Sequence, residues 1–128
     1  MTPKILIYSI VFMFLGVLVM VTHSCMKELK PVVPVVITTP VSDISQSFAL
    51  SGGTITSDGG AEITAKGVCW GIASNPTISE SKTIDGTGTG NFVSTLTGLL
   101  PGSTYHVRAY ATNSLGTSYG DDITFNVA

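Results

Sequence analysis

The side chains that could support catalysis are few in this chain of 128 residues. The two histidines are His23 and His106, and His23 is expected to leave with an N-terminal signal segment. A serine triad would then depend on His106, which lies in a strand-like run with no nucleophile motif nearby. A solvent-facing strand residue is the simpler interpretation, so the sequence predicts no catalytic residue and no enzyme.

Paired carboxylates are the other acid–base chemistry that the sequence offers. Glu62, Glu80, Asp58 and Asp85 are the acids that could act in glycoside hydrolysis. They fall on turns and loop flanks, and nothing in the sequence indicates a cleft that they share. A small hydrolase is therefore the least favoured function.

The sequence also predicts no metal site and no cofactor. One histidine and an isolated cysteine do not supply the three or four ligands of zinc at the usual spacings. Asp85, Asp121 and Asp122 lack the alternating oxygen ligands of an EF-hand loop, so solvated turns are expected there. The glycine-rich stretch 86–90 has no helix N-terminus behind it to cradle a phosphate.

The two cysteines stand in different contexts. An exported protein meets an oxidising compartment, so a disulfide is the first interpretation of Cys25 and Cys69. However, Cys25 lies between an apolar segment and a proline-containing stretch, whereas Cys69 lies within a strand-like run. This placement argues against a disulfide and leaves Cys25 free for another role.

The N-terminal segment has the three parts of a secretory signal. Lys4 precedes an almost unbroken apolar run, 5–21, and small polar residues follow the run. The run is shorter than the roughly 20 apolar residues that span a bilayer, and a single-pass anchor is the alternative. Export and cleavage before Cys25 are therefore predicted. A formal net charge of −2 without a basic cluster excludes nucleic acid as a partner.

The remainder of the chain is predicted to be all-β. From Val41 onward, short alternating runs are separated by Gly, Asn, Asp and Pro turns, which indicates an antiparallel β-sandwich. Prolines at 31, 34 and 40 predict an extended tether over 25–34 and a first edge strand at 35–38. We expect one sandwich of six or seven strands over 35–128, preceded by a hydrophobic signal helix.

Alternation along these runs assigns side chains to the core. Within 104–112, Tyr105 shares the inward face with Val107, Ala109 and Ala111. The other expected core sets are Val68 with Trp70, Phe92 with Leu96, Phe48 with Leu50, and Ile123 with Phe125 and Val127. Cys69 has the opposite parity to Trp70, so its side chain should point away from the core.

The outward face of the run 104–112 is the predicted binding surface. His106, Arg108 and Tyr110 project from this face, and Asn113 opens the following turn, 113–116. Aromatic and arginine side chains are enriched at binding interfaces. The competing interpretation is that these side chains only solvate one face of a sheet.

The stretch 96–113, LTGLLPGSTYHVRAYATN, resembles a corner and strand of fibronectin type III domains, which are immunoglobulin-like. The resemblance covers roughly 35–127 and is closest to fibronectin-like repeats of bacterial envelope proteins. It implies that Tyr105 forms a tyrosine corner, with its hydroxyl bonded to backbone a few residues upstream. Trp70 departs from the animal pattern, because it falls on the third strand. The turn 113–116 lacks Arg-Gly-Asp, so integrin binding is not implied.

The tetrapeptide THSC, 22–25, resembles a bacterial lipobox, although Thr22 and His23 differ from the usual residues. The resemblance implies a signal peptide at 1–24 and a palmitate-containing lipid anchor on Cys25, which holds far more firmly than one acyl chain. No Asp follows the cysteine, which favours the outer membrane. Lys27 and Glu28 suggest exposure at the cell surface.

These features predict a lipid-anchored, non-catalytic module of the cell envelope, used for binding or spacing. The expected partners are the membrane, through the anchor, and an unidentified envelope protein or glycan. Similar modules occur in outer-membrane glycan-uptake systems, so a carbohydrate-binding accessory lipoprotein is the alternative. Tyr110 and Tyr119 are the aromatic residues that this alternative offers.

Overall fold

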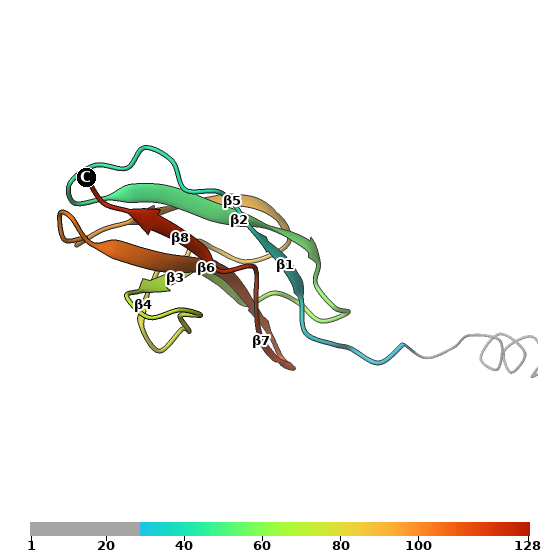
Figure 1. Ribbon diagram of the computed structural model, residues 1–128. Helices are drawn as coiled ribbons and strands as arrows, with labels where there is room; N and C mark the ends of the chain where they lie inside the picture. Colours follow the sequence, from blue (N-terminus) through green and yellow to red (C-terminus); the bar gives the residue numbers. More distant parts are fainter. Residues whose placement is uncertain (1–28) are drawn as a thin grey trace, which may run out of the picture. The chain divides into compact units, whose positions relative to one another are not determined.

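The computed structural model describes residues 29–128 as a β-structure (Figure 1). The strands are β1 (Val35–Thr38), β2 (Ala49–Ser57), β3 (Ala65–Gly71), β4 (Ser81–Lys82), β5 (Gly90–Leu96), β6 (Thr104–Asn113), β7 (Gly116–Tyr119) and β8 (Ile123–Asn126). In this part of the chain no helix has the length and apolar character needed to cross a membrane. The predicted signal helix and Cys25 lie outside the described residues.

The strands form two antiparallel sheets packed as a sandwich. The smaller sheet has the order β1-β2-β5, and the larger has the order β4-β3-β6-β7, with β8 also paired to β6. The predicted all-β sandwich is therefore confirmed. Residues 29–128 hold eight strands rather than six or seven, because two residues, Ser81 and Lys82, pair with the end of β3 as the short edge strand β4.

The core between the sheets follows the alternation that the sequence predicts for most strands. On β6, Tyr105, Val107, Ala109 and Ala111 are all buried in one hydrophobic cluster. The same cluster contains Val68, Trp70, Phe92, Leu96, Phe125 and Val127, with Ile123 packed against it. The cluster joins residues from both sheets, so it is the element that holds the sandwich together.

The expected core pair on β2 is wrong. Phe48 lies before the strand and is exposed, whereas the inward positions of β2 are occupied by small residues and Ile55. Gly53 shows why the small residues are needed. A Cβ on Gly53 would lie 2.7 Å from the Ala109 Cβ and 2.9 Å from the Phe92 ring. Phe92, which is paired with Gly53 in the β2–β5 register, fills the space that the glycine leaves.

The outer face of the larger sheet is covered by the connection that runs from β3 through β4 to β5. Thr83 N donates to Val68 O at 2.8 Å, and Asp85 N donates to Lys66 O at 2.7 Å. Gly67 permits this close crossing, because a Cβ there would lie 2.3 Å from the Thr83 carbonyl oxygen. The face that the sequence predicts to be open is therefore largely occupied by the protein's own chain.

Candidate functional site

Arg108 projects outward from β6, as the alternation predicts, but it holds the loop between β3 and β4. Its Nε and Nη2 donate to Pro76 O at 2.9 and 2.7 Å, and Nη2 also reaches Asn75 O at 3.3 Å. The guanidinium lies 4.0 Å from the centre of the Tyr119 ring, in a cation–π arrangement. Tyr119 in turn accepts a hydrogen bond from Ile78 N. Both side chains thus fasten this loop to the sheet.

His106 is paired with an acid on the same face. Its Nδ1 lies 3.0 and 3.1 Å from the two carboxylate oxygens of Asp122, and the Thr124 hydroxyl lies 3.4 Å from the same nitrogen. Asp122 also accepts a hydrogen bond from Asn75 N. Within residues 29–128 the imidazole therefore meets a carboxylate and a threonine hydroxyl, and this arrangement ties β6 to the loop before β8.

Tyr110 is buried, which corrects its predicted place on an exposed surface. Only 2% of the residue is exposed, because it pairs with Gly67 and lies under the segment around Thr83. Its hydroxyl donates to Thr83 O. Burial raises the pKa of the Tyr110 phenol to about 12, with a further contribution from the nearby charge of Asp85. Tyr110 therefore cannot offer a ring to a glycan.

Asn113 is also buried, with 3% of the residue exposed, which corrects its assignment to an open turn. Its Nδ2 donates to Val32 O at 2.7 Å and to Asp58 O at 2.9 Å. Its Oδ1 accepts from Leu115 N at 2.8 Å. Asn113 thus binds the incoming chain and the turn after β2, because three backbone groups converge on one amide.

Cys69 points away from the central core, as its parity predicts, and is buried beneath the same loop. Its thiol lies 3.4 Å from Pro76 O and 3.6 Å from Arg108 O. Burial raises the pKa of the Cys69 thiol to about 11; the charge of Arg108 opposes this shift, and that of Glu80 adds to it. A thiol of this kind is an unreactive packing group.

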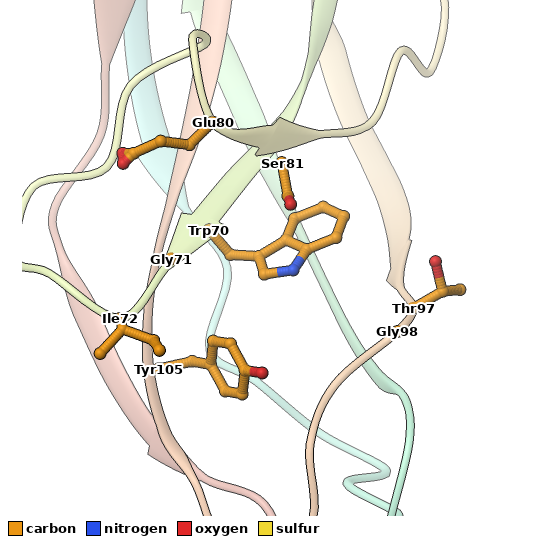
Figure 2. A pocket seen from close by; sticks show the side chains of 8 residues that line it. All are labelled: Trp70, Gly71, Ile72, Glu80, Ser81, Thr97, Gly98 and Tyr105. Atoms are coloured by element: carbon orange, nitrogen blue, oxygen red, sulfur yellow. The ribbon is translucent and has the colours of Figure 1, made fainter.

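A groove opens where β3 ends beside the short strand β4 (Figure 2). Its volume is about 590 Å³, within the range of small-ligand sites. Eight residues line it: Trp70, Gly71, Ile72, Glu80, Ser81, Thr97, Gly98 and Tyr105. β4 ends after two residues and β5 belongs to the other sheet, so the two sheets part beside Trp70.

The groove contains polar groups that the described part of the chain does not use. In residues 29–128 the Trp70 indole N–H and the hydroxyls of Ser81 and Thr97 have no hydrogen-bond partner. No fully buried polar side-chain atom in this range is unpaired, so the indole nitrogen of Trp70 is accessible from the surface. Figure 2 shows the indole between Ser81 and Tyr105, with Thr97 on the opposite wall. These groups can pair with a ligand.

Tyr105 has two roles in this geometry. Its hydroxyl accepts a hydrogen bond from Leu100 N at 3.0 Å, which is the upstream backbone contact that the tyrosine-corner resemblance implies. Its ring stacks on Phe125 with the ring centres 5.8 Å apart. Since the hydroxyl accepts in this bond, its proton remains available to donate to another group.

The groove is apolar on one wall and carries one charge. Ile72 is 69% exposed and forms an aliphatic wall. Glu80 is the charged residue among the eight that line the groove, and one of its oxygens accepts from Thr77 N at 3.2 Å. Across residues 29–128, no group of three or more His, Cys, Asp or Glu side chains is placed to hold a metal ion. The groove can therefore donate and accept hydrogen bonds around a small polar ligand.

Sequence reasoning assigned Trp70 to the core and Tyr105 to the corner, and both residues are buried as expected. It did not place them together at a groove. The edge of the sheet is left incomplete because the segment after Gly71 forms only the two-residue strand β4, and no sharp signal in the sequence marks this. Three residues of the predicted surface, His106, Arg108 and Tyr110, share the strand β6 with the groove residue Tyr105 but lie on the opposite face.

No protein-family model matches this sequence, and no curated protein does. Among solved structures, a shorter form of the sensor domain of the anti-sigma factor RsgI4 from Pseudobacteroides cellulosolvens aligns with a TM-score of 0.54 and 19% identity, over 78% of this chain and 97% of that one. The solution structure of that sensor domain gives 0.52 and 20%, over 73% and 74%.

A third similar structure is that of domains A168-A170 from titin. It aligns with a TM-score of 0.50 and 25% identity, over 76% of this chain and 32% of the titin chain. These likenesses support the fibronectin type III or immunoglobulin-like fold that the sequence resemblance implied. They concern the fold of the sandwich and leave its ligand to be inferred from the groove.

Proposed function

We propose that this chain is a lipid-anchored module of the bacterial cell envelope that binds a ligand in the groove beside Trp70 and catalyses no reaction. The groove itself is the observation that carries the proposal. In residues 29–128 it combines a hollow of about 590 Å³ with donors and acceptors that have no protein partner. The polar groups on the outer face of β6, by contrast, are bonded to the protein's own loops.

The anchor in this proposal is Cys25, at the end of a signal peptide, 1–24, and before a tether, 25–34. The support is the sequence pattern, which also favours the outer membrane and exposure at the cell surface. Metabolic palmitate labelling in a bacterial host tests it. Cys25→Ser should lose the label, while Cys69→Ala, the control at the buried cysteine, should keep it. Retention of the label in Cys25→Ser would contradict the anchor.

The lining of the groove favours an uncharged glycan over an anionic ligand. A sugar presents hydroxyls that donate and accept, together with an apolar C–H surface. Ser81, Thr97 and the Trp70 N–H match the hydroxyls, and Ile72 matches the apolar surface. Glu80 would repel an acidic sugar, since the eight lining residues include no Lys, Arg or His to balance it. This supports the role of a carbohydrate-binding accessory lipoprotein.

A glycan array probed with soluble residues 29–128, which contain the whole observed core, tests the ligand class. Neutral glycans should bind, whereas glycans rich in uronic acid should not. The double variant Ser81→Ala/Thr97→Val should lower affinity about tenfold, because two hydrogen bonds are lost at about 0.7 kcal/mol each.

Thr95→Val is the matched control, since Thr95 is an exposed threonine on β5 that does not line the groove. This change should leave the affinity for a bound glycan unaltered. An array without any bound glycan would exclude the glycan, and an envelope protein would then be the ligand to seek. Binding that the double variant leaves unchanged would place the site elsewhere.

A further inference from the structure

The end of the module opposite the groove is built around the incoming chain. Val32 N donates to Gly59 O at 2.8 Å, and Asn113 Nδ2 donates to Val32 O at 2.7 Å. The Ser118 hydroxyl donates to Pro34 O at 2.6 Å. The chain is therefore fixed to the sandwich from Val32 onward, three residues before β1 begins at Val35.

Gly59 shows how closely the incoming chain lies against the turn after β2. Its φ is +74°, which favours glycine, and a Cβ at this position would lie 2.1 Å from Val32 O. The incoming chain at Val32 can therefore lie this close only because Gly59 has no side chain. A segment held in this way fixes the direction in which the chain leaves the module.

Exposed aliphatic side chains gather where the chain enters. Val32 and Val33 are 58% and 41% exposed, and Leu115, at the tip of the β6–β7 hairpin, is 50% exposed. Val33 Cγ1 would lie 3.7 Å from a Cβ on Gly116, the neighbour of Leu115, so the tether and the hairpin tip lie side by side. We call these three side chains, Val32, Val33 and Leu115, the entry face.

The distances along the chain place the entry face and the groove far apart. Val32 lies seven positions after Cys25, so the chain between them spans at most about 24 Å in any conformation. Tyr105 and Asn113 stand at opposite ends of β6, about 26 Å apart at the usual strand rise. Figure 1 shows the same arrangement, with β4 at one end of the sandwich and β7 and the incoming chain at the other.

We propose that the entry face rests on the lipid surface that holds Cys25, and that this contact orients the groove away from the membrane. The inference depends on the proposed anchor. Lipid is the occupant because the anchor confines the entry face to within a short tether length of the bilayer, so even a weak apolar contact is made often. Asp58 and Glu62 belong to the turn beside this face and outnumber Lys30 of the incoming chain, so the net charge of these three side chains favours zwitterionic over anionic headgroups.

Spin labels on the full acylated chain test the contact. The labels are placed at Leu115→Cys and, as the matched control beside the groove, at Ile72→Cys, in vesicles of phosphatidylcholine and phosphatidylethanolamine. Cys69 is fully buried, so it should stay unlabelled. The label at 115 should collide more often with oxygen than with a water-soluble nickel complex, and the label at 72 should show the reverse. Anionic lipid should reduce the oxygen contact at 115.

A flotation assay separates failure of this contact from failure of the anchor. The wild-type chain should float with the vesicles, and Cys25→Ser should not. If the wild-type chain fails to float, the anchor and the contact are both overturned. If it floats but the labels at 115 and 72 are equally accessible to the nickel complex, only the contact is overturned.

Discussion

The outer face of β6 and the groove beside Trp70 contain similar kinds of side chain, yet their polar groups are used differently. On the outer face, the donors of Arg108 and the hydroxyl of Tyr110 are bonded to backbone carbonyls of the protein itself. In the groove, the Trp70 indole N–H and the Ser81 hydroxyl have no partner within residues 29–128. The composition of a surface therefore indicates less about binding than the state of its hydrogen bonds does.

The difference arises from the connection between the two sheets. The segment between β3 and β5 crosses the outer face of β6, where Gly67 lets Thr83 approach the sheet closely. The same segment forms only the short strand β4 beside Trp70, and so leaves the edge of the sandwich open there. The same stretch of chain thus covers the outer face of β6 and leaves the groove beside Trp70 open.

The largest expected effect comes from Asn113→Ala. The change removes three hydrogen bonds to backbone, so that Val32 O loses its amide donor and Asp58 O keeps only the long bond from Ala61 N at 3.4 Å. We expect the free energy of unfolding to fall by about 3 to 4 kcal/mol, measured by urea denaturation of residues 29–128. Ser114→Ala, at the exposed neighbour, should change it by less than about 0.5 kcal/mol.

The opposite result for Asn113→Ala would contradict the distinction between the covered face and the groove. A loss of ligand affinity without a loss of stability would show that Asn113 belongs to a binding surface, as the sequence predicts. The structure instead predicts that affinity per folded molecule stays unchanged. Affinity and stability must therefore be measured on the same preparation.

The covered face should also make stability depend on alkaline pH. Burial raises the pKa of the Cys69 thiol from 9.0 to about 11 and that of the Tyr110 phenol from 10.0 to about 12. Both groups are neutral when protonated, so the folded state keeps these protons longer than the unfolded state does. Their contribution is complete below pH 9 and is lost as the pH rises to 11 and 12. For Cys69 the loss is about 2 to 3 kcal/mol.

Urea midpoints at pH 7, 9, 10 and 11 check this dependence. Cys69→Ala should flatten the curve between pH 9 and 10, where Cys69 is the first of the two groups to ionise in the unfolded chain. An unchanged slope in that variant would mean that the thiol is not covered as the structure shows.

Arg108→Ala sharpens the comparison with a smaller effect. The guanidinium loses its bonds to Pro76 O and its contact with the Tyr119 ring, but Arg108 is partly exposed, so water replaces some of these contacts. We expect a loss of about 1 to 2 kcal/mol in stability and no change in ligand affinity. Lys82→Ala, which removes an exposed bond to Ile78 O, should cost less than about 0.5 kcal/mol. Weaker ligand binding in Arg108→Ala would support the binding surface that the sequence predicts on the outer face of β6.

Much of the fold could be predicted because it depends on local patterns. The alternation of β6 gave its inward side chains, and the prolines before Val35 indicated an extended entry to an edge strand. The error at Phe48 has a long-range cause. Gly53 is small because Phe92 of β5 needs the space, and neither residue shows this in its own stretch of sequence.

The candidate site could be predicted only in part, for a similar reason. Alternation correctly directs Arg108 and Tyr110 away from the core, but it does not reveal that another segment covers them. The groove requires knowing that β5 joins the sheet opposite β4, which is a matter of topology. The tyrosine corner was the exception, since the resemblance implied a contact between residues only five apart in sequence, Leu100 and Tyr105.

Tyr105→Phe gives the smallest expected effect on stability. It tests a residue that belongs both to the folded core and to the groove. The ring and its stacking on Phe125 are kept, while the bond from Leu100 N is lost, at a cost of about 1 kcal/mol in unfolding free energy. Tyr105 also lines the groove, and its hydroxyl has a proton left to donate, so ligand affinity should also fall, by about threefold to tenfold. Urea denaturation and titration with an array-selected glycan measure the two quantities.

Thr97→Val is the matched comparison for this last change, because Thr97 lines the groove and its hydroxyl has no partner within residues 29–128. Thr97→Val should lower ligand affinity without lowering stability, whereas Arg108→Ala should lower stability without lowering affinity. Tyr105→Phe alone should lower both. If it lowers stability only, the ligand does not use the Tyr105 proton, and the binding part of the groove ends at Trp70 and Thr97. In that case the corner serves the fold alone.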